Sequence, residues 1–366
     1  MRDTRTGSKS SYSSLVMAGL SKAYEHVRKT NCVPVDLASA RIIIFSDLHR
    51  GNRDNSDDFR LCELAYNDAL KHYLANGFTL IVLGDAEDLW KYRPMEVKKA
   101  YRESLSLESQ FSKEERYVRI VGNHDDLWRE KGQFKRYFND LFNLLVPVDG
   151  VCLSLEIGNE QVGTIFITHG HQGTLDSDKF SWFSKLVLRY LYRPFQELTG
   201  HRTTTPSTSI DLRDEHSKAM YEWSETICKE KAILVAGHTH MPVFLSLNHV
   251  EQLMARRAGM INSLAQQGVH AGREQAALDE SILRIDGEIE ERQRKMGGAP
   301  PTIASVLAKR PSYFNTGCCS FSDGDITGIE IEGRKIRLVR WKRKSGPTTR
   351  SVPADSDLVD DVFRRL

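Results

Sequence analysis

Apolar and polar positions alternate along this chain with two different periods. Short runs of apolar, mostly β-branched residues predict strands at 41–46, 79–83, 117–121, 151–157, 162–168 and 232–236. Further short strands are expected at 243–247, 313–316, 325–331 and 335–341. Longer stretches with one apolar face predict helices at 57–75, 134–145 and 209–230. Because strands and helices share the chain, we expect an α/β fold.

Five of the predicted strands are followed directly by polar clusters. These clusters are Asp47-Leu48-His49, Gly84-Asp85-Ala86-Glu87-Asp88, Gly122-Asn123-His124-Asp125, His169-Gly170-His171 and Gly237-His238-Thr239-His240. Side chains two positions apart on extended backbone point the same way, so Asp-x-His and His-x-His can each serve one site. Open α/β sheets bind ligands at the carboxyl ends of their strands. We therefore expect the five clusters to meet at one edge.

The chemistry of the clusters points to metal ions. Carboxylate, amide and imidazole groups supply the ligands, and no cysteine belongs to the set. Such ligands suit manganese, iron, zinc or cobalt rather than a structural zinc site. The ligands are too many for one tetrahedral ion. Two ions about 3.5–4 Å apart, which share a bridging carboxylate, would use them all.

In order, the clusters resemble the pattern D-x-H, G-D-x-x-D, G-N-H-D/E, H and G-H-x-H of the calcineurin-like metallophosphoesterases. The resemblance spans roughly residues 41–242 and resumes at Tyr313. It implies a sandwich of two mixed β-sheets flanked by helices, with helical insertions. It also implies a metal-dependent phosphoesterase, which is a hydrolase acting on ester or pyrophosphate bonds.

The resemblance implies two divalent metal ions, with manganese preferred and iron, zinc or cobalt as alternatives. The ligands that it implies are Asp47, His49, Asp85, Asn123, His169, His238 and His240. The first ion would be held by Asp47, His49 and His240, Asp85 would bridge, and the remaining residues would hold the second ion. The ions would lower the pKa of a bridging water, and the resulting hydroxide would attack phosphorus in line.

Catalytic and substrate-binding roles follow from the same resemblance. His124 would contact phosphate and protonate the leaving oxygen, Asp125 would orient His124 by a hydrogen bond, and Asp88 would support a ligand from behind. Arg50 and Arg53 come just after His49 and fit solvated loop charges or a phosphate clamp equally well. His171 stands where some relatives carry aspartate and is expected to line the substrate pocket. Three further histidines are interpreted as surface residues: His201, His216 and His270.

Composition and charge bound the class of protein. The chain has 366 residues, a net charge of +2 and a pI of about 8.1, which does not demand a nucleic-acid partner. Six cysteines show no spacing typical of a zinc site or a disulfide framework, so a reducing cytosol is expected. Residues 1–14 lack the apolar core of a signal peptide, and no run reaches the roughly 18 apolar residues of a membrane span. A cytoplasmic protein is therefore expected.

Several segments lie outside or interrupt the predicted core of residues 41–247. Residues 1–40 form an extension with a helix near 13–29 and a disordered start at 1–11. Residues 178–208 are expected to form an apolar, aromatic helical cap with a basic stripe, which would be either a core helix or a contact with acyl chains or a membrane surface. Residues 248–312 form a helical insertion, either a lid or, through 248–296, a homo-oligomer arm. Closing strands follow at 313–341, then a loose charged tail at 342–366.

Three functions are compatible with this pattern. The first is hydrolysis of a small phosphoester, a nucleotide or a UDP-sugar-lipid. The last is suggested because residues 84–90 and 314–317 resemble motifs of the UDP-diacylglucosamine pyrophosphatase group, although that group has arginine where this chain has His124. The second is a metal-dependent nuclease acting on DNA or RNA, which would need a continuous basic channel. The third is a non-catalytic binding scaffold, which a missing ligand would favour, and none of the matched ligands is missing.

Overall fold

Two β-sheets packed face to face form the centre of the computed structural model, which describes residues 5–173, 210–266, 273–295, 301–343 and 346–366. The six-stranded sheet has the order β11-β10-β9-β2-β3-β4, and the five-stranded sheet has the order β1-β5-β6-β7-β8. The strands are β1 (Cys32–Asp36), β2 (Arg41–Phe45), β3 (Thr79–Leu83), β4 (Tyr117–Ile120), β5 (Gly150–Ile157), β6 (Glu160–Thr168), β7 (Ala232–Ala236), β8 (Tyr313–Asn315), β9 (Ile326–Glu332), β10 (Lys335–Lys342) and β11 (Thr349–Asp357). Each sheet mixes parallel and antiparallel pairs.

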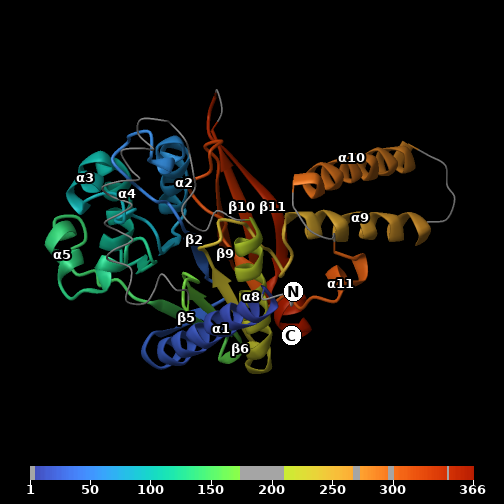
Figure 1. Ribbon diagram of the computed structural model, residues 1–366, viewed down its shortest axis with the longest axis horizontal. Helices are drawn as coiled ribbons and strands as arrows, with labels where there is room; N and C mark the ends of the chain where they lie inside the picture. Colours follow the sequence, from blue (N-terminus) through green and yellow to red (C-terminus); the bar gives the residue numbers. More distant parts are fainter. Residues whose placement is uncertain (1–4, 174–209, 267–272, 296–300, 344–345) are drawn as a thin grey trace.

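Helices cover the outer face of each sheet (Figure 1). The six-stranded sheet is covered on one side by α2 (Glu63–Ala75), α3 (Pro94–Ala100), α4 (Arg102–Lys113) and α5 (Gln133–Phe138). The five-stranded sheet is covered by α1 (Arg5–Thr30) and α8 (Ile210–Ile227). The architecture is therefore the predicted α/β sandwich of two mixed sheets flanked by helices.

Strand β2 shows no alternation of apolar and polar residues, because both of its faces are covered. Ile42 and Ile44 pack between the two sheets, whereas Ile43 and Phe45 pack beneath the helices on the outer face. A strand covered on both faces is expected to be continuously apolar. Each such side chain that leaves water stabilises the fold by about 1.5–3 kcal/mol. This apolar filling fixes the strand ends that carry the polar clusters.

Four predicted elements differ from the structure. The helix expected at 134–145 is shorter, because α5 ends at Phe138 with Asn139 as its C-cap. The strand expected at 243–247 consists only of isolated bridges from Val243 and Phe244. The start of the chain is helical from Arg5, where disorder was expected up to residue 11. The helix expected at 57–75 divides into a 3-10 turn at Asp58–Leu61 and α2.

The predicted loose tail is also wrong. Residues Thr349–Asp357 form β11, which pairs antiparallel with β10 and closes the outer edge of the six-stranded sheet. Arg350 from this strand reaches Glu330 of β9 at 2.6 Å. Charged residues are usual on edge strands because they discourage pairing with another molecule. The composition that looked like a solvated tail is thus that of a protected sheet edge.

The segment in which a helical insertion was expected contains three helices. Helices α9 (His249–Gln266) and α10 (Arg273–Lys295) pack against each other and extend away from the sandwich, followed by α11 (Ile303–Leu307) (Figure 1). The predicted cap at 178–208 lies outside the described residues. Among the helices that the structure describes, none combines the length and the apolar character needed to cross a membrane.

Candidate metal centre

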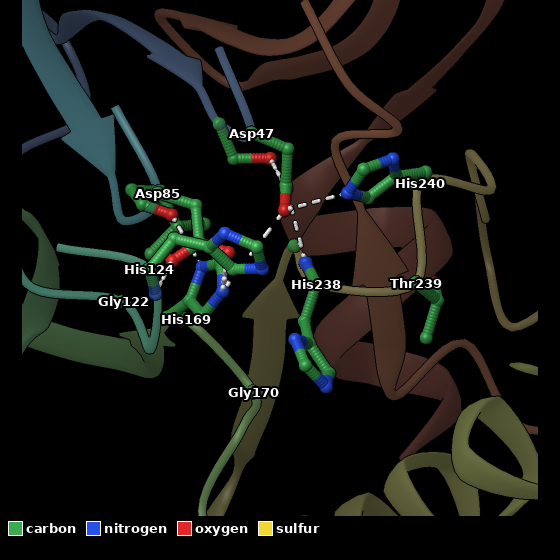
Figure 2. Close-up of polar contacts among 12 residues, drawn as sticks. Asp47, Asp85, Gly122, His124, His169, Gly170, His238, Thr239 and His240 are labelled. Carbon is green, nitrogen blue, oxygen red and sulfur yellow. Dashed lines mark hydrogen bonds and ion pairs between the residues drawn. The ribbon is translucent and has the colours of Figure 1, made fainter. Parts of the chain in front are cut away.

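The polar clusters meet because of the order of the strands. Within the six-stranded sheet, β2, β3 and β4 are parallel neighbours, and β6 and β7 are parallel neighbours in the other sheet. Their carboxyl ends therefore open at one edge of the sandwich. Figure 2 shows the side chains of Asp47, Asp85, His169 and His240 directed toward one another. The backbone N–H of His238 donates to the Asp47 carboxylate in the same view, at 3.0 Å.

One group of ligand atoms gathers at the end of β2. A carboxylate oxygen of Asp47 and one nitrogen each of His49 and His240 lie within 4.8 Å of one another. Within this group, His240 Nε2 is 3.2 Å from Asp47 Oδ1, and His49 Nε2 is 3.8 Å from the same oxygen. We call these three residues the first ligand set. Its chemistry fits a divalent transition-metal ion.

A second ligand set consists of Asp85, His169 and His238, whose ligand atoms also lie within 4.8 Å of one another. His169 Nε2 is 3.3 Å from Asp85 Oδ2, and the same oxygen is 3.8 Å from His49 Nε2. The carboxylate of Asp85 therefore lies between His169 of the second set and His49 of the first set. His124 forms a further candidate group with His49 and Asp85, so the site is dense in possible ligands.

Three buried ligand atoms at the centre make no hydrogen bond: Asp47 Oδ1, Asn123 Oδ1 and His169 Nε2. Buried polar atoms in folded proteins are nearly always satisfied, and an unsatisfied one calls for an explanation such as an ion. Asn123 follows β4 and was expected beside the second set. The residues present therefore fit the metal ions that the sequence implied.

One histidine of each set lies in a field that favours positive charge, whereas burial lowers the pKa of the other two, His49 and His238. Burial alone would lower the pKa of His169, but the carboxylates of Asp85 and Asp47 raise it to about 9. Burial likewise opposes charge on His240, and Asp47 raises its pKa to about 10. A divalent cation would replace such protons, because ligands bind metal in their deprotonated form.

The backbone at these positions is strained. Five of the seven predicted ligands have a positive φ, between 50° and 68°: Asp47, His49, Asp85, His238 and His240. A side-chain-bearing residue in this region costs on the order of 1–3 kcal/mol and persists where the surroundings enforce it, which is typical of active sites. Gly122 allows the close packing, since a Cβ there would collide with the Asp85 carboxylate. A Cβ at Gly84 would collide with the His169 ring in the same way.

The ring of His124 is held by Asp88 and Trp90. Its Nδ1 lies 3.0 Å from Asp88 Oδ1, and the other Asp88 oxygen lies 3.1 Å from Lys91 Nζ. Burial opposes ionisation of Asp88, but Lys91 and then His124 hold the pKa of Asp88 below its usual range. The Trp90 ring stacks on His124 at 4.0 Å, and its Nε1 donates to the Asn123 carbonyl at 2.8 Å. The ring of His124 is therefore fixed in position.

Asp125 does not make the hydrogen bond to His124 that we expected, since Asp88 makes it. The Asp125 carboxylate instead accepts the backbone N–H groups of Gly122 at 2.7 Å and Ala86 at 3.0 Å. It thereby joins the loop after β4 to the loop after β3. Asp125 fixes the backbone around Asn123 and Asp85, and not the His124 ring.

Arg50 is not placed to clamp a substrate phosphate, because its side chain is 0% exposed. Its guanidinium bonds Glu108 Oε1 at 2.6 Å and Glu87 Oε1 at 2.9 Å. Arg119 of β4 pairs with the same two glutamates. We call Arg50, Glu87, Glu108 and Arg119 the buried ion network. Burial would raise the pKa of Glu108, but Arg50 and Arg119 hold it below its usual range.

Arg53 is directed toward α2 and the turn between α3 and α4. Its Nη2 lies 2.6 Å from Glu63, and its Nε donates to the Ala100 carbonyl at 2.8 Å. The guanidinium also lies over the Tyr101 ring. These contacts fit a structural role in the loop after His49, and the expected phosphate contact stays a prediction.

Histidines outside the predicted ligands surround the second set. The His171 ring lies 5.3 Å from the His169 ring, and its Nε2 is 2.9 Å from Arg129 Nη2. His216 is only 3% exposed, so its interpretation as a surface residue is wrong. Its ring lies 4.9 Å from the His238 ring. A helical spacing places His216 on the buried face of α8, with Met220, Trp223 and Ile227, which would have revealed it. His201 and His270 lie outside the described residues.

Comparison with known proteins decides the family. The family described as calcineurin-like phosphoesterase matches residues 40–242, which is more than half of the chain. The chain belongs to the calcineurin-like phosphoesterase family. Among solved structures, this chain is similar to Vacuolar Protein Sorting 29 from Cryptosporidium parvum, with 11% identity over 87% of this chain and 98% of that chain and a TM-score of 0.33. No curated protein matched the sequence significantly.

The matched region contains both ligand sets, His124 and the buried ion network. A member of this family with carboxylate and imidazole groups at the strand ends is consistent with metal-dependent hydrolysis of phosphate esters. The match ends before α9 and begins after α1. These helices are therefore additions to the matched core.

Proposed function

We propose that this phosphoesterase uses two divalent cations, preferably manganese, to hydrolyse a phosphate ester or pyrophosphate bond. The observation that supports this most is the pair of ligand sets, with the Asp85 carboxylate between them. Cations bound there would polarise the phosphoryl group and promote deprotonation of the attacking water. The substrates that fit the proposal are small phosphoesters, nucleotides and UDP-sugar-lipid-like molecules.

Asp85 and His124 would have different roles in this reaction. Asp85 is suited to face both cations, because its Oδ1 accepts the His124 backbone N–H at 2.8 Å while its Oδ2 faces His169 and His49. With Nδ1 of His124 held by Asp88, Nε2 is the ring nitrogen left to give a proton to the leaving oxygen. The stacked Trp90 keeps that ring from turning away.

Asp85→Ala tests the metal centre. The variant should lose manganese-dependent hydrolysis of aryl phosphate monoesters and diesters, UDP-sugars and single-stranded DNA, with products identified by mass. Glu103→Ala, which removes an exposed carboxylate on the outer helix α4, is the control and should retain activity. Undiminished turnover by Asp85→Ala with an intact fold would reject the proposal. Cleavage confined to DNA would favour a nuclease instead.

His124→Ala tests proton donation. The variant should bind manganese but turn over poor leaving groups about 10²–10⁴-fold more slowly, with a smaller loss for good leaving groups that need no proton. The measurement is kcat for a series of aryl phosphates with leaving groups of different pKa. Equal losses across the series would contradict a donor role for His124.

A further inference from the structure

The loop His169-Gly170-His171 is fastened by a residue that the family pattern does not include. His216 of α8 bonds the Gly170 carbonyl through Nε2 at 2.8 Å. The same ring also packs against the second ligand set, because its centroid lies 4.9 Å from that of the His238 ring, at an interplanar angle of 66°. His216 therefore touches the ligand loops of both β6 and β7.

The N-terminal helix completes this arrangement. The Tyr12 hydroxyl of α1 lies 2.9 Å from His216 Nδ1. A carbonyl can only accept, so His216 Nε2 carries the proton that goes to Gly170. Nδ1 of a neutral ring is then an acceptor, and the Tyr12 hydroxyl donates to it. Tyr12 thus fixes the tautomer in which His216 can hold the Gly170 carbonyl.

Close backbone packing joins α1 to the same loop. Gly19 of α1 faces Gly173, and a Cβ at either glycine would collide with the backbone of the other segment. Trp223 of α8 donates to Ser21 of α1 at 2.9 Å, which fastens the two helices to each other. The position of α1 is therefore determined relative to the loop that carries His169.

We propose that Tyr12 and His216 are positioning residues for the second ligand set, so that α1, which precedes the family-matched region, is a working part of the metal centre. Metal-ligating histidines depend on partners behind them, and loss of such a partner typically weakens metal binding by about 10–100-fold. His216 acts in this way on His238 through ring contact and on His169 through the Gly170 carbonyl. The proposal rests on the two-cation function proposed above.

The test is manganese titration of the full-length chain by calorimetry, followed by electron paramagnetic resonance of the loaded protein. Wild type should bind two ions and show the spin coupling of a close pair. We call binding at the first ligand set the first event and binding at the second ligand set the second event. His216→Leu should weaken the second binding event by about 10–100-fold, reduce the coupled signal, and leave the first event within about threefold of wild type. Tyr12→Phe should weaken the second event by about three- to tenfold, because a hydroxyl donor is lost but the ring remains.

Two further variants separate positioning from general destabilisation. His216→Gln offers an amide donor for Gly170 and an amide oxygen for Tyr12, so it should bind the second ion within about threefold of wild type. Tyr24→Phe makes the same change as Tyr12→Phe on the same helix, at a hydroxyl that bonds Glu230 away from the centre, and should leave both events unchanged.

The outcomes distinguish this inference from the function on which it rests. Two manganese ions bound equally well by wild type, Tyr12→Phe and a folded His216→Leu would overturn the positioning role and leave the two-cation function standing. Equal weakening of both events in Tyr12→Phe and Tyr24→Phe would overturn it as well. Absence of any manganese binding by the wild type would overturn both.

Discussion

The two halves of the metal centre are supported by different chemistry. On the side of the six-stranded sheet, the loops after β2, β3 and β4 rest on the buried ion network, with side chains that are 0–1% exposed. On the side of the five-stranded sheet, the loops after β6 and β7 rest on neutral groups, chiefly His216 and the Tyr12 hydroxyl. Asp85 lies where the two halves join, because its carboxylate faces His49 of one half and His169 of the other.

This difference predicts how substitutions in each half should affect stability and metal affinity. Removing one member of a buried ion pair leaves an uncompensated charge and destabilises the whole fold. Removing a neutral positioning residue leaves little electrostatic penalty, so its effect should appear mainly in metal affinity. The six-stranded half should therefore control stability, and the five-stranded half should control the second cation.

The largest effect is expected from Glu108→Ala. Arg50 and Arg119 would lose a shared partner in the core, so the free energy of unfolding should fall by about 3–5 kcal/mol. Urea unfolding followed by circular dichroism measures this loss. Glu103→Ala, on the exposed face of the same helix, is the matched control and should cost less than about 1 kcal/mol. A loss below about 1 kcal/mol for Glu108→Ala would remove the contrast between the two halves.

A pH effect of up to about 3 kcal/mol is expected from Asp57, also in the six-stranded half. Burial raises the pKa of Asp57 to about 6, and bonds from Tyr101 at 2.5 Å and the Arg53 N–H at 2.7 Å only partly offset this. Between pH 4 and 6 the folded protein therefore binds more protons than the unfolded chain. The contribution of Asp57 to stability should therefore fall as the pH rises through this range.

Asp57→Asn removes that titration, so between pH 4 and 6 the stability of the variant should change more positively with pH than that of wild type. Chemical unfolding at intervals from pH 4 to 7 measures the difference from wild type. Asp140→Asn is the control, because a hydrogen bond from Lys98 lowers the pKa of exposed Asp140, so Asp140 titrates below this pH range. A wild-type profile that rises between pH 4 and 6 to the same extent as that of Asp57→Asn would contradict the assignment.

A smaller effect, about 2.7 kcal/mol at a free concentration of 100 times Kd, is expected when manganese is added. The ion should bind the folded state through atoms that make no hydrogen bond, such as Asp47 Oδ1 and Asn123 Oδ1. Thermal unfolding with manganese and with a chelator measures the gain. Asp85→Ala should lose most of it, whereas Glu103→Ala should retain it. A melting temperature independent of manganese would argue against binding at the centre.

The sequence predicted the parts of the molecule in which local pattern and chemistry agree. The strands that lead to the clusters are short apolar runs. The polar residues that follow each strand therefore lie at the edge of the sheet. The family pattern then supplied the grouping of Asp47 with His240 and of Asp85 with His169 and His238. The geometry brings these groups together as that pattern implies.

The missed parts depend on partners far away in the chain. Arg50 looked like a loop charge because Glu108, its partner, lies 58 residues later. The polar composition of β11 resembled a tail, and only its pairing with β10 identifies it as a strand. His216 had no motif around it, and its role depends on Tyr12, 204 residues earlier. Sequence pattern reports a residue's neighbours along the chain, whereas these roles come from neighbours in space.

Each ligand set takes members from both sheets: Asp47 and His49 meet His240 across the sandwich, and Asp85 meets His169 and His238. During folding, a single sheet offers only half of the coordination that either ion requires. Tight manganese uptake should then begin only when the two sheets have docked. The time at which refolding protein begins to bind manganese tightly would therefore report when the two sheets dock. Adding a chelator at different times during refolding would measure this.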